Sequence, residues 1–236
     1  MKTYRSSKGP FSERPVYSPQ EIEDLCADEL RKVNLYPSEP RAVRIDRFIE
    51  KRFGVSPAYE DLPDGLLGFT KFGPKGVEKI VVAKSLADDP NKVANRRINT
   101  TLAHEAGHGL LHAHLFALGA ESASLFDGNV DSKSPKILCR EDGIPGIQKR
   151  SNYDGRWWEF QANQTIGALL IPKTLAERCL DSTLTVAGSF GIRKLEAQNR
   201  ARAIKLLSDV FNVNPIVAKI RVEQLFPEKQ ERQLTM

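Results

Sequence analysis

The stretch RINTTLAHEAGHGLLH, at residues 97–112, decides the architecture that we expect for this chain of 236 residues. Its apolar residues recur at the spacing of a helix, which we extend from about Asn95 to Leu118. The residues expected on the core side of this helix are Ile98, Leu102, Ala106, Leu110 and Ala113. The segment His104-Glu105-Ala106-Gly107-His108 therefore lies inside a helix.

Two histidines and a glutamate of this helix have the spacing of a metal site. Residues four apart lie on the same helix face, about 6 Å apart along the axis, so His104 and His108 can reach one ion. Glu105 is one helical step away, where its carboxylate can take a proton from a metal-activated water instead of joining the ligands. The same five-residue pattern also occurs in helices that bind nothing, and a catalytic zinc ion needs a third protein ligand.

The two later histidines of the same helix do not supply this ligand. His114 lies ten positions after His104, as in metzincins, but that arrangement needs a glycine where this chain has Leu111. It also needs a Met-turn, and the only methionines are the first and last residues. His112 lies a further turn along an unbroken helix, too far from His104 to share one ion with it. We interpret both as solvated or packing histidines.

Glu159 is the better candidate for the third ligand. It lies near the start of a second expected helix, Trp157–Leu170, which stops near Pro172 because the residue before a proline is pushed out of the α region. A helix that crosses the first one can present this carboxylate to both imidazoles. Asn163 lies one turn further on, so its amide can accept a hydrogen bond from a ligand histidine. The predicted ligands of one zinc ion per chain are His104, His108 and Glu159.

The rest of the chain predicts an α+β fold with a small antiparallel sheet and a helical C-terminal region. Further helices are indicated at Gln20–Val33, Arg41–Phe53, Arg193–Phe211 and Pro215–Phe226. Two strands, Leu66–Phe72 and Val77–Ala83, flank the hairpin loop Gly73-Pro74-Lys75-Gly76. Residues 119–154 show little periodicity, so we expect a long loop or insertion there, and such loops are often functional.

The domain organisation that we expect is one folded domain with a short tail. Residues 1–18 are polar and rich in Ser, Pro, Lys and Arg, which predicts a flexible tail. Residues 19–236 would form the domain, with 176–236 as its helical C-terminal part. The composition is 40% hydrophobic, which suffices for a substantial core at this length.

The net charge, the cysteine spacing and the length of the apolar runs limit the kinds of protein that this chain can be. The 35 basic and 30 acidic residues give a net charge of +5, dispersed along the chain, which is only a mild bias towards anionic partners. The three cysteines, Cys26, Cys139 and Cys179, form no CxxC pair and indicate neither a disulfide framework nor a structural zinc knuckle. No secretory signal or membrane-spanning run is present, so we expect a cytoplasmic protein.

Cys139 leaves one alternative open. Thiolates bind zinc well, and the neighbouring Arg140 would lower the pKa of this thiol, so Cys139 could cap the metal as a switch. A buried and inert cysteine is the commoner outcome.

Residues 97–112, followed by Glu159-Phe160-Gln161-Ala162-Asn163 and by Ala168-Leu169-Leu170-Ile171-Pro172, resemble the ImmA/IrrE family of metallo-endopeptidases. The resemblance extends from about Ile22 to Leu225, because Val213–Val222 is similar to the family's C-terminal helical signature. In this order the two motifs are specific. Two features depart from the common pattern. Ala106 stands where leucine is usual, and the interval from His108 to Glu159 is longer than in many members, so substrate choice or autoinhibition could differ there.

The resemblance implies both a fold and an activity. The fold would be zincin-like, and the enzyme would be a gluzincin with zinc at His104, His108 and Glu159 and with Glu105 as the catalytic base. It would cleave a helix-turn-helix repressor in the cytoplasm and so release phage, mobile-element or stress-response genes. Neither departure removes a ligand or the base.

A second hypothesis treats the chain as a non-proteolytic regulator with a structural zinc site, which binds a repressor or DNA through its helical C-terminal region. The last two expected helices meet around Asn212–Asn214, in an order that superficially suggests a helix-turn-helix. Their positive charge comes from Arg193, Lys194, Arg200, Arg202, Lys205, Lys219 and Arg221. Charged residues are ordinary on surface helices, so we do not expect direct DNA binding.

Overall fold

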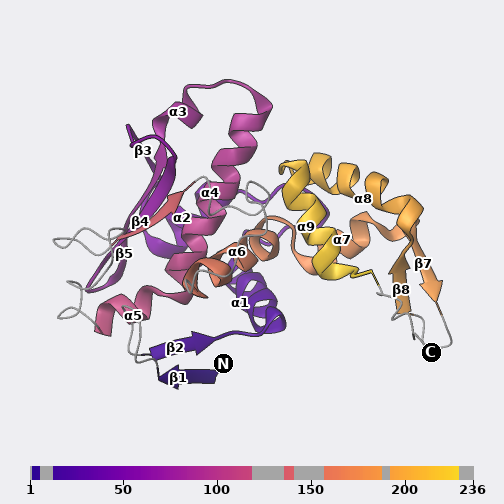
Figure 1. Cartoon of the computed structure of the whole chain (residues 1–236), viewed down its shortest axis with the longest axis horizontal. Coiled ribbons are helices and arrows are strands. Elements are labelled where there is room, and N and C mark those ends of the chain that lie inside the picture. Colours follow the sequence, from indigo (N-terminus) through magenta and orange to yellow (C-terminus); the bar gives the residue numbers. More distant parts are fainter. Residues whose placement is uncertain (1, 6–12, 119–135, 141–156, 188–191, 229–236) are drawn as a thin grey trace, which may run out of the picture.

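A computed structural model describes residues 2–5, 13–118, 136–140, 157–187 and 192–228, which form a mixed α+β fold (Figure 1). The largest sheet lies at one side of the view, two crossing helices occupy the middle, and the C-terminal helices lie at the other side. No helix within the described ranges is long and apolar enough to cross a membrane.

The main sheet has four strands in the order β3, β5, β4, β6 among the described residues. Their bounds are Ala58–Glu60 for β3, Leu66–Gly73 for β4, Gly76–Ala83 for β5 and Lys136–Arg140 for β6. Strand β4 is antiparallel to β5 and β6, whereas β3 pairs with β5 in parallel. The sheet is therefore mixed, not purely antiparallel as expected from the sequence. Gly76 has a φ of 109°, a conformation that suits glycine, and closes the hairpin.

Helix α4, Lys92–Leu111, is the centre of the fold. It packs against β4 and β5, against α2, Ile45–Phe53, and against α6, Trp157–Leu170, which in turn contacts α1, Pro19–Lys32. Short helices complete this part: α3 at Lys84–Ala87, α5 at Ala113–Leu118 and α7 at Lys173–Cys179. Because neighbours surround α4, all but one of the residues from Thr100 to Leu111 are buried, including the polar ones.

The ends of these helices follow from local sequence. Ser18 caps α1 through a reciprocal capping box with Glu21, and Pro19 occupies the first turn, where its missing N–H costs nothing. Asn91 caps α4 by accepting from the backbone N–H of Ala94 at 2.8 Å. Gly54 ends α2 in the left-handed conformation, with φ of 73°.

Helices α4 and α6 are in close contact at Gly107. A Cβ atom at this position would lie 2.1 Å from Thr165 Oγ1 and 3.2 Å from the carbonyl oxygen of Ala162. The Thr165 hydroxyl donates to that same carbonyl at 2.7 Å, so it is fixed in place. An alanine at position 107 would force the Thr165 side chain or one of the two helices to move.

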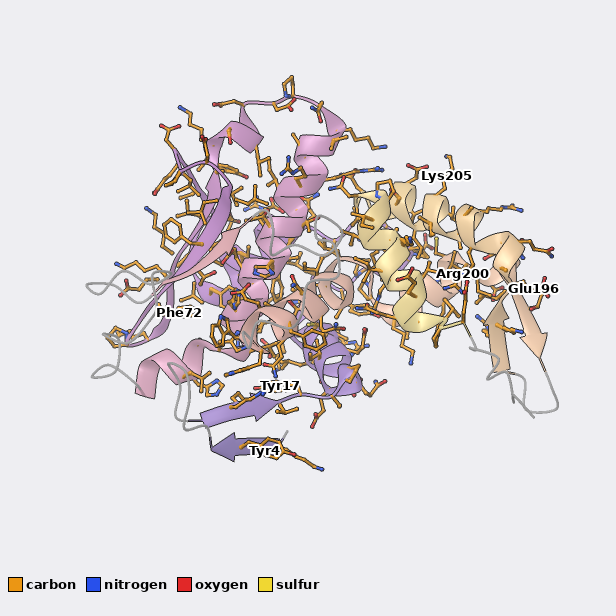
Figure 2. All side chains as sticks on the ribbon, viewed as in Figure 1. Tyr4, Tyr17, Phe72, Glu196, Arg200 and Lys205 are labelled. Carbon is orange, nitrogen blue, oxygen red and sulfur yellow. The ribbon has the colours of Figure 1, made fainter. Side chains whose placement is uncertain are left out.

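The C-terminal region consists of a two-stranded sheet and a helix pair. After the short 3-10 helix Asp181–Thr183, strands β7, Leu184–Ala187, and β8, Ile192–Leu195, pair in antiparallel fashion. Helices α8, Ala197–Val210, and α9, Pro215–Leu225, follow. Figure 2 shows Glu196 just before α8 and Arg200 and Lys205 along it, far from the strand that carries Phe72.

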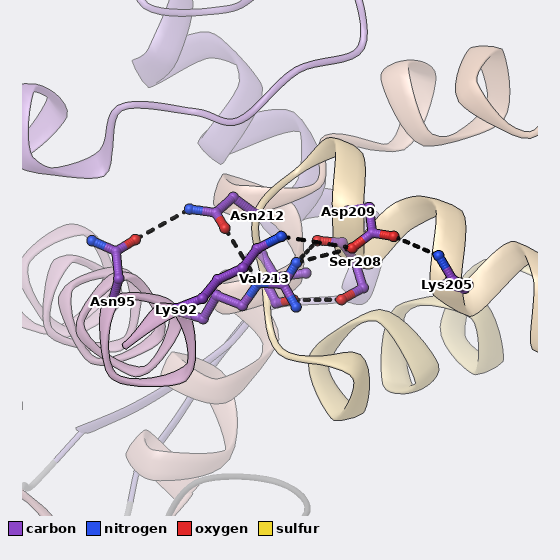
Figure 3. Close-up of polar contacts among 8 residues, drawn as sticks. Lys92, Asn95, Lys205, Ser208, Asp209, Asn212 and Val213 are labelled. Atoms are coloured by element: carbon purple, nitrogen blue, oxygen red, sulfur yellow. Dashed lines mark hydrogen bonds and ion pairs between the residues drawn. The ribbon is translucent and has the colours of Figure 1, made fainter. Parts of the chain in front are cut away.

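The turn between α8 and α9 is attached to the first turns of α4 (Figure 3). The guanidinium of Arg96 donates to Ser208 O at 2.9 Å, to Asp209 Oδ1 at 3.2 Å and to Asn212 Oδ1 at 3.2 Å. Asn212 also donates to Asn95 Oδ1 at 3.1 Å. Arg96 is only 7% exposed, so these bonds compensate the burial of its charge.

Three further sequence-based expectations, besides the purely antiparallel sheet, differ from this fold. Residues 1–18 were expected to be a flexible tail, but β1, Lys2–Arg5, pairs with β2, Glu13–Val16. The single helix expected from Asn95 to Leu118 is divided at His112, which ends α4. The helix expected from Arg193 begins only at Ala197, because β8 comes first. The expected loop 119–154 lies outside the described residues except for β6.

Candidate metal centre

Helices α4 and α6 bring His104, His108 and Glu159 together. The two Nε2 atoms are 3.0 Å apart, and the carboxylate oxygens of Glu159 lie 3.2 Å from His104 Nε2 and 3.6 Å from His108 Nε2. The two imidazoles are fully buried, and the Glu159 side chain is 16% exposed. The three residues form a group that could hold a metal ion.

The spacing and chemistry of these donors fit zinc. Tetrahedral ligands bound at about 2.0–2.2 Å lie about 3.3–3.6 Å from one another. The two Nε2 atoms lie 3.0 Å apart, and the separations of 3.2 Å from His104 Nε2 to Glu159 Oε2 and 3.6 Å from His108 Nε2 to Glu159 Oε1 are also close to this range. Two imidazole nitrogens and one carboxylate oxygen are also the ligand set of many catalytic zinc sites, in which water takes the fourth position.

Each of the two clustered histidines is held at its other ring nitrogen, the one that faces away from Glu159. His104 Nδ1 lies 3.0 Å from Asn163 Oδ1, an amide oxygen one turn after Glu159 on α6. His108 Nδ1 lies 3.1 Å from His112 Nδ1. Hydrogen bonds of this kind set the tautomer and the ring orientation of metal-binding histidines.

Burial and mutual contact shift the pKa values of this cluster. Burial alone would raise the pKa of Glu159, but the neighbouring imidazoles of His108 and His104 reverse this and hold it well below its usual range. Burial lowers the pKa of His108, with Glu159 opposing the shift. Complete burial, followed by the nearby His108, holds the pKa of His112 well below its usual value. Ionised carboxylate and neutral imidazoles are the forms that bind metal ions.

Glu105 lies beside this cluster and faces the sheet. Its Oε2 atom accepts a hydrogen bond from the Thr70 hydroxyl on β4 at 2.5 Å, and the same hydroxyl lies 3.2 Å from the Glu105 carbonyl oxygen. A Cβ atom at Gly68 would lie 2.8 Å from Thr101 Cγ2 and 3.5 Å from Glu105 Oε1. Strand β4 therefore passes close over the carboxylate and fixes one of its oxygens.

The remaining histidine and the cysteines lie elsewhere. His114 is exposed at the start of α5, where it lines a cavity with Arg52 and Lys75. Cys26 is buried and Cys179 is half-buried, and both are free thiols. The backbone of Cys139 pairs with Gly68 in the β4–β6 register, but its side chain lies outside the described part of the chain. Whether this thiol could reach the metal centre, as considered from the sequence, therefore stays a hypothesis.

Several of the C-terminal cations considered for DNA binding are engaged within the chain. Arg221 is 2% exposed and pairs with the Glu23 carboxylate through its two terminal nitrogens, Nη1 and Nη2. Its third nitrogen, Nε, donates to Ile171 O at 2.9 Å. Other ion pairs link Arg193 to Asp181, Arg200 to Glu228, Lys205 to Asp209 and Lys219 to Glu223. The turn at Asn212 also contacts α4, through Arg96 and Asn95.

Comparison with known proteins adds no family assignment. No protein-family model matches the chain, and no curated protein matches it.

Two polar residues of the site, Gln161 and Thr70, carry no prediction from the sequence, and His112 is predicted only as a solvated or packing histidine. His112 is not one of the three clustered ligands but is fully buried against His108, and its Nε2 lies 3.1 Å from Gln161 Oε1. The four-residue spacing of His104, His108 and His112 could have indicated that the three imidazoles lie side by side on one helix face. Thr70 had no comparable signal, because its contact with Glu105 joins distant parts of the chain.

Proposed function

We propose that this chain is a zinc-dependent endopeptidase of the gluzincin type, with a zincin-like fold similar to that of the ImmA/IrrE family. The observation that carries the proposal is the meeting of His104, His108 and Glu159 from two separate helices, at distances suited to one zinc ion. The five-residue motif of α4 alone would not support this function, because many helices carry it without binding metal.

The residues around the cluster have complementary roles in peptide hydrolysis. A zinc ion held there would polarise the scissile carbonyl and acidify a water molecule. Glu105 would take the proton from that water and pass it to the leaving amine. The Thr70 hydroxyl would keep the Glu105 carboxylate oriented, while Asn163 orients the ring of His104.

The proposed substrate is a helix-turn-helix repressor in the cytoplasm. Support for this substrate class comes from the paired motifs at residues 97–112 and 159–172 and their resemblance to the ImmA/IrrE family. Cleavage of such a repressor would release phage, mobile-element or stress-response genes.

Metal analysis of three purified proteins tests the metal centre. The wild type should contain one zinc per chain, and Glu159→Ala should lose most of it because one of three ligands is gone. Glu105→Gln should retain zinc, since Glu105 lies outside the ligand group. A wild type that binds no zinc after reconstitution, or a Glu159→Ala variant that binds it normally, would refute the proposal.

Co-expression with a helix-turn-helix repressor encoded beside this chain tests the activity. The wild type should cut the repressor, and Glu105→Gln should slow cleavage by about 10²–10⁴-fold, because a general base contributes that much. Full cleavage by Glu105→Gln would disprove the mechanism. An intact repressor held in a tight complex with zinc-loaded wild type would favour the non-proteolytic regulator.

A further inference from the structure

A chain of buried polar contacts runs from the metal centre to the N-terminal hairpin. His108 Nδ1 lies 3.1 Å from His112 Nδ1, and His112 Nε2 lies 3.1 Å from Gln161 Oε1. The amide nitrogen of Gln161 then donates to the backbone carbonyl of Pro15, in β2, at 2.8 Å. His108 and His112 are completely buried, and Gln161 is 5% exposed.

The last link of this chain fixes the direction of every hydrogen bond in it. A backbone carbonyl only accepts, so the amide nitrogen of Gln161 has to face Pro15 and its oxygen has to face His112. An amide oxygen also only accepts, so the proton of a neutral His112 lies on Nε2. Its Nδ1 is then an acceptor, and His108 has to donate from its own Nδ1. The lone pair of His108 is thereby left on Nε2, the atom that faces Glu159.

We infer that His112 is a positioning residue for the metal ligand His108, and that Gln161 and the Pro15 carbonyl set the tautomer of both rings. This inference rests on the proposed function, because it concerns how the same metal centre is organised. It assigns a role to a histidine outside the ligand group, to an amide on α6 and to the N-terminal strand pair.

The surroundings of His112 hold its ring in the orientation that the chain requires. Trp157 packs edge-on against it, with ring centroids 5.5 Å apart and an interplanar angle of 77°. Arg14, the residue before Pro15 on β2, lies over the same indole with its Cζ 5.9 Å from the ring centroid. Strand β2 thus contacts this part of the site through a side chain as well as through its carbonyl. His104 is supported differently, by the amide of Asn163.

Zinc affinity measured by competition with a chromophoric chelator tests the inference in the full chain. His112→Phe keeps an aromatic ring beside Trp157 but removes both ring nitrogens, and Gln161→Leu breaks the next link while it leaves both imidazoles. Loss of partners that orient a ligand typically weakens metal binding by about 10–100-fold, and we expect this for His112→Phe. We expect a loss of about tenfold for Gln161→Leu.

Matched controls separate this role from general effects of substitution. His114→Phe is the same exchange at an exposed histidine two residues on. Gln164→Leu removes a half-buried amide three residues after Gln161 on α6, one whose hydrogen bond goes to Gln224 and not to the histidines. Both should bind zinc as the wild type does. The absorption bands of the cobalt-substituted protein should change in His112→Phe and Gln161→Leu and not in the controls, because the bands report ligand geometry.

A double variant distinguishes a chain from two independent packing contacts. If the contacts act in series, adding Gln161→Leu to His112→Phe should weaken zinc binding no further, whereas independent effects would add. Additive losses in zinc affinity, or wild-type affinity in both single variants, would overturn the inference about His112. The proposed function would still stand in either case, provided that the wild type binds zinc. If His112→Phe fails to fold, the zinc affinity of Gln161→Leu, compared with that of Gln164→Leu, tests the inference instead. A wild type that binds no zinc overturns both.

Discussion

Replacing Gly107 by alanine should push helices α4 and α6 apart beside the metal centre. The added Cβ would lie 2.1 Å from Thr165 Oγ1, well inside the 3.4 Å at which ordinary van der Waals contact begins. Overpacking of a core generally costs about 1–3 kcal/mol, and the better helix propensity of alanine returns up to about 1 kcal/mol. We therefore expect a net loss of about 1–2 kcal/mol in the free energy of unfolding, measured by urea denaturation.

The same substitution should weaken zinc binding. Gly107 lies between the two ligand histidines of α4, and Thr165 lies on the helix that carries Glu159. Metal–ligand distances are held within about 0.2 Å, so a separation of the helices on the order of 1 Å removes Glu159 from bonding range. The chelator competition assay should then give an affinity on the order of tenfold lower, comparable to the loss of an orienting partner.

A compensating substitution provides the control. Thr165→Ala removes the hydroxyl that the new Cβ would strike, so the Gly107→Ala exchange should cost less in that background. Stability and zinc affinity both at wild-type level in Gly107→Ala would refute the idea that this contact sets the distance between the ligand helices.

Three further outcomes are expected. Arg221→Met should lower the free energy of unfolding, measured in urea, by about 3 kcal/mol, because it leaves the Glu23 carboxylate without its bidentate partner. A loss below about 1 kcal/mol would count against a structural role for this ion pair. Burial alone would raise the pKa of Glu29, but its hydrogen-bonded partners Lys32 and Arg52 lower this pKa on balance. The ionised carboxylate therefore stabilises the fold near neutral pH, and this stabilisation is lost as the pH falls below about 4.5. Glu29→Gln should flatten this part of the stability curve, and an unchanged curve would contradict the assignment. Thr70→Val should reduce the cleavage rate about tenfold with zinc content unchanged, since the lost bond orients Glu105, and unaltered kinetics would exclude that role.

Periodicity predicted the elements that carry the site better than the elements around it. Helix α6 and strands β4 and β5 have bounds close to those expected, because their apolar residues follow one regular pattern. Strand β6 was missed, since five residues inside a region rich in Gly, Ser and Asp give no period. Strand β8 was taken for the start of a helix because Ala197 follows it after a single residue.

The site itself was predictable to the extent that it depends on spacing along the helices. His104 and His108 follow from the four-residue interval, and Asn163 from its place one turn after Glu159. Residues 1–18 seemed unrelated to the site because they are polar and short of apolar side chains. Their contribution is a main-chain carbonyl, that of Pro15, and the position of a carbonyl depends on tertiary packing and leaves no mark on residue type.

The anchoring of Arg96 has a consequence for the order in which a ribosome makes this chain. Its partners, Ser208, Asp209 and Asn212, lie 112 to 116 positions downstream. The first turns of α4 can therefore not reach their final packing while nascent protein ends before α8, and the guanidinium stays hydrated until then. Translation has to pass the whole interval between His108 and Glu159, and then reach the helix pair beyond it, before the first turns of the central helix are anchored.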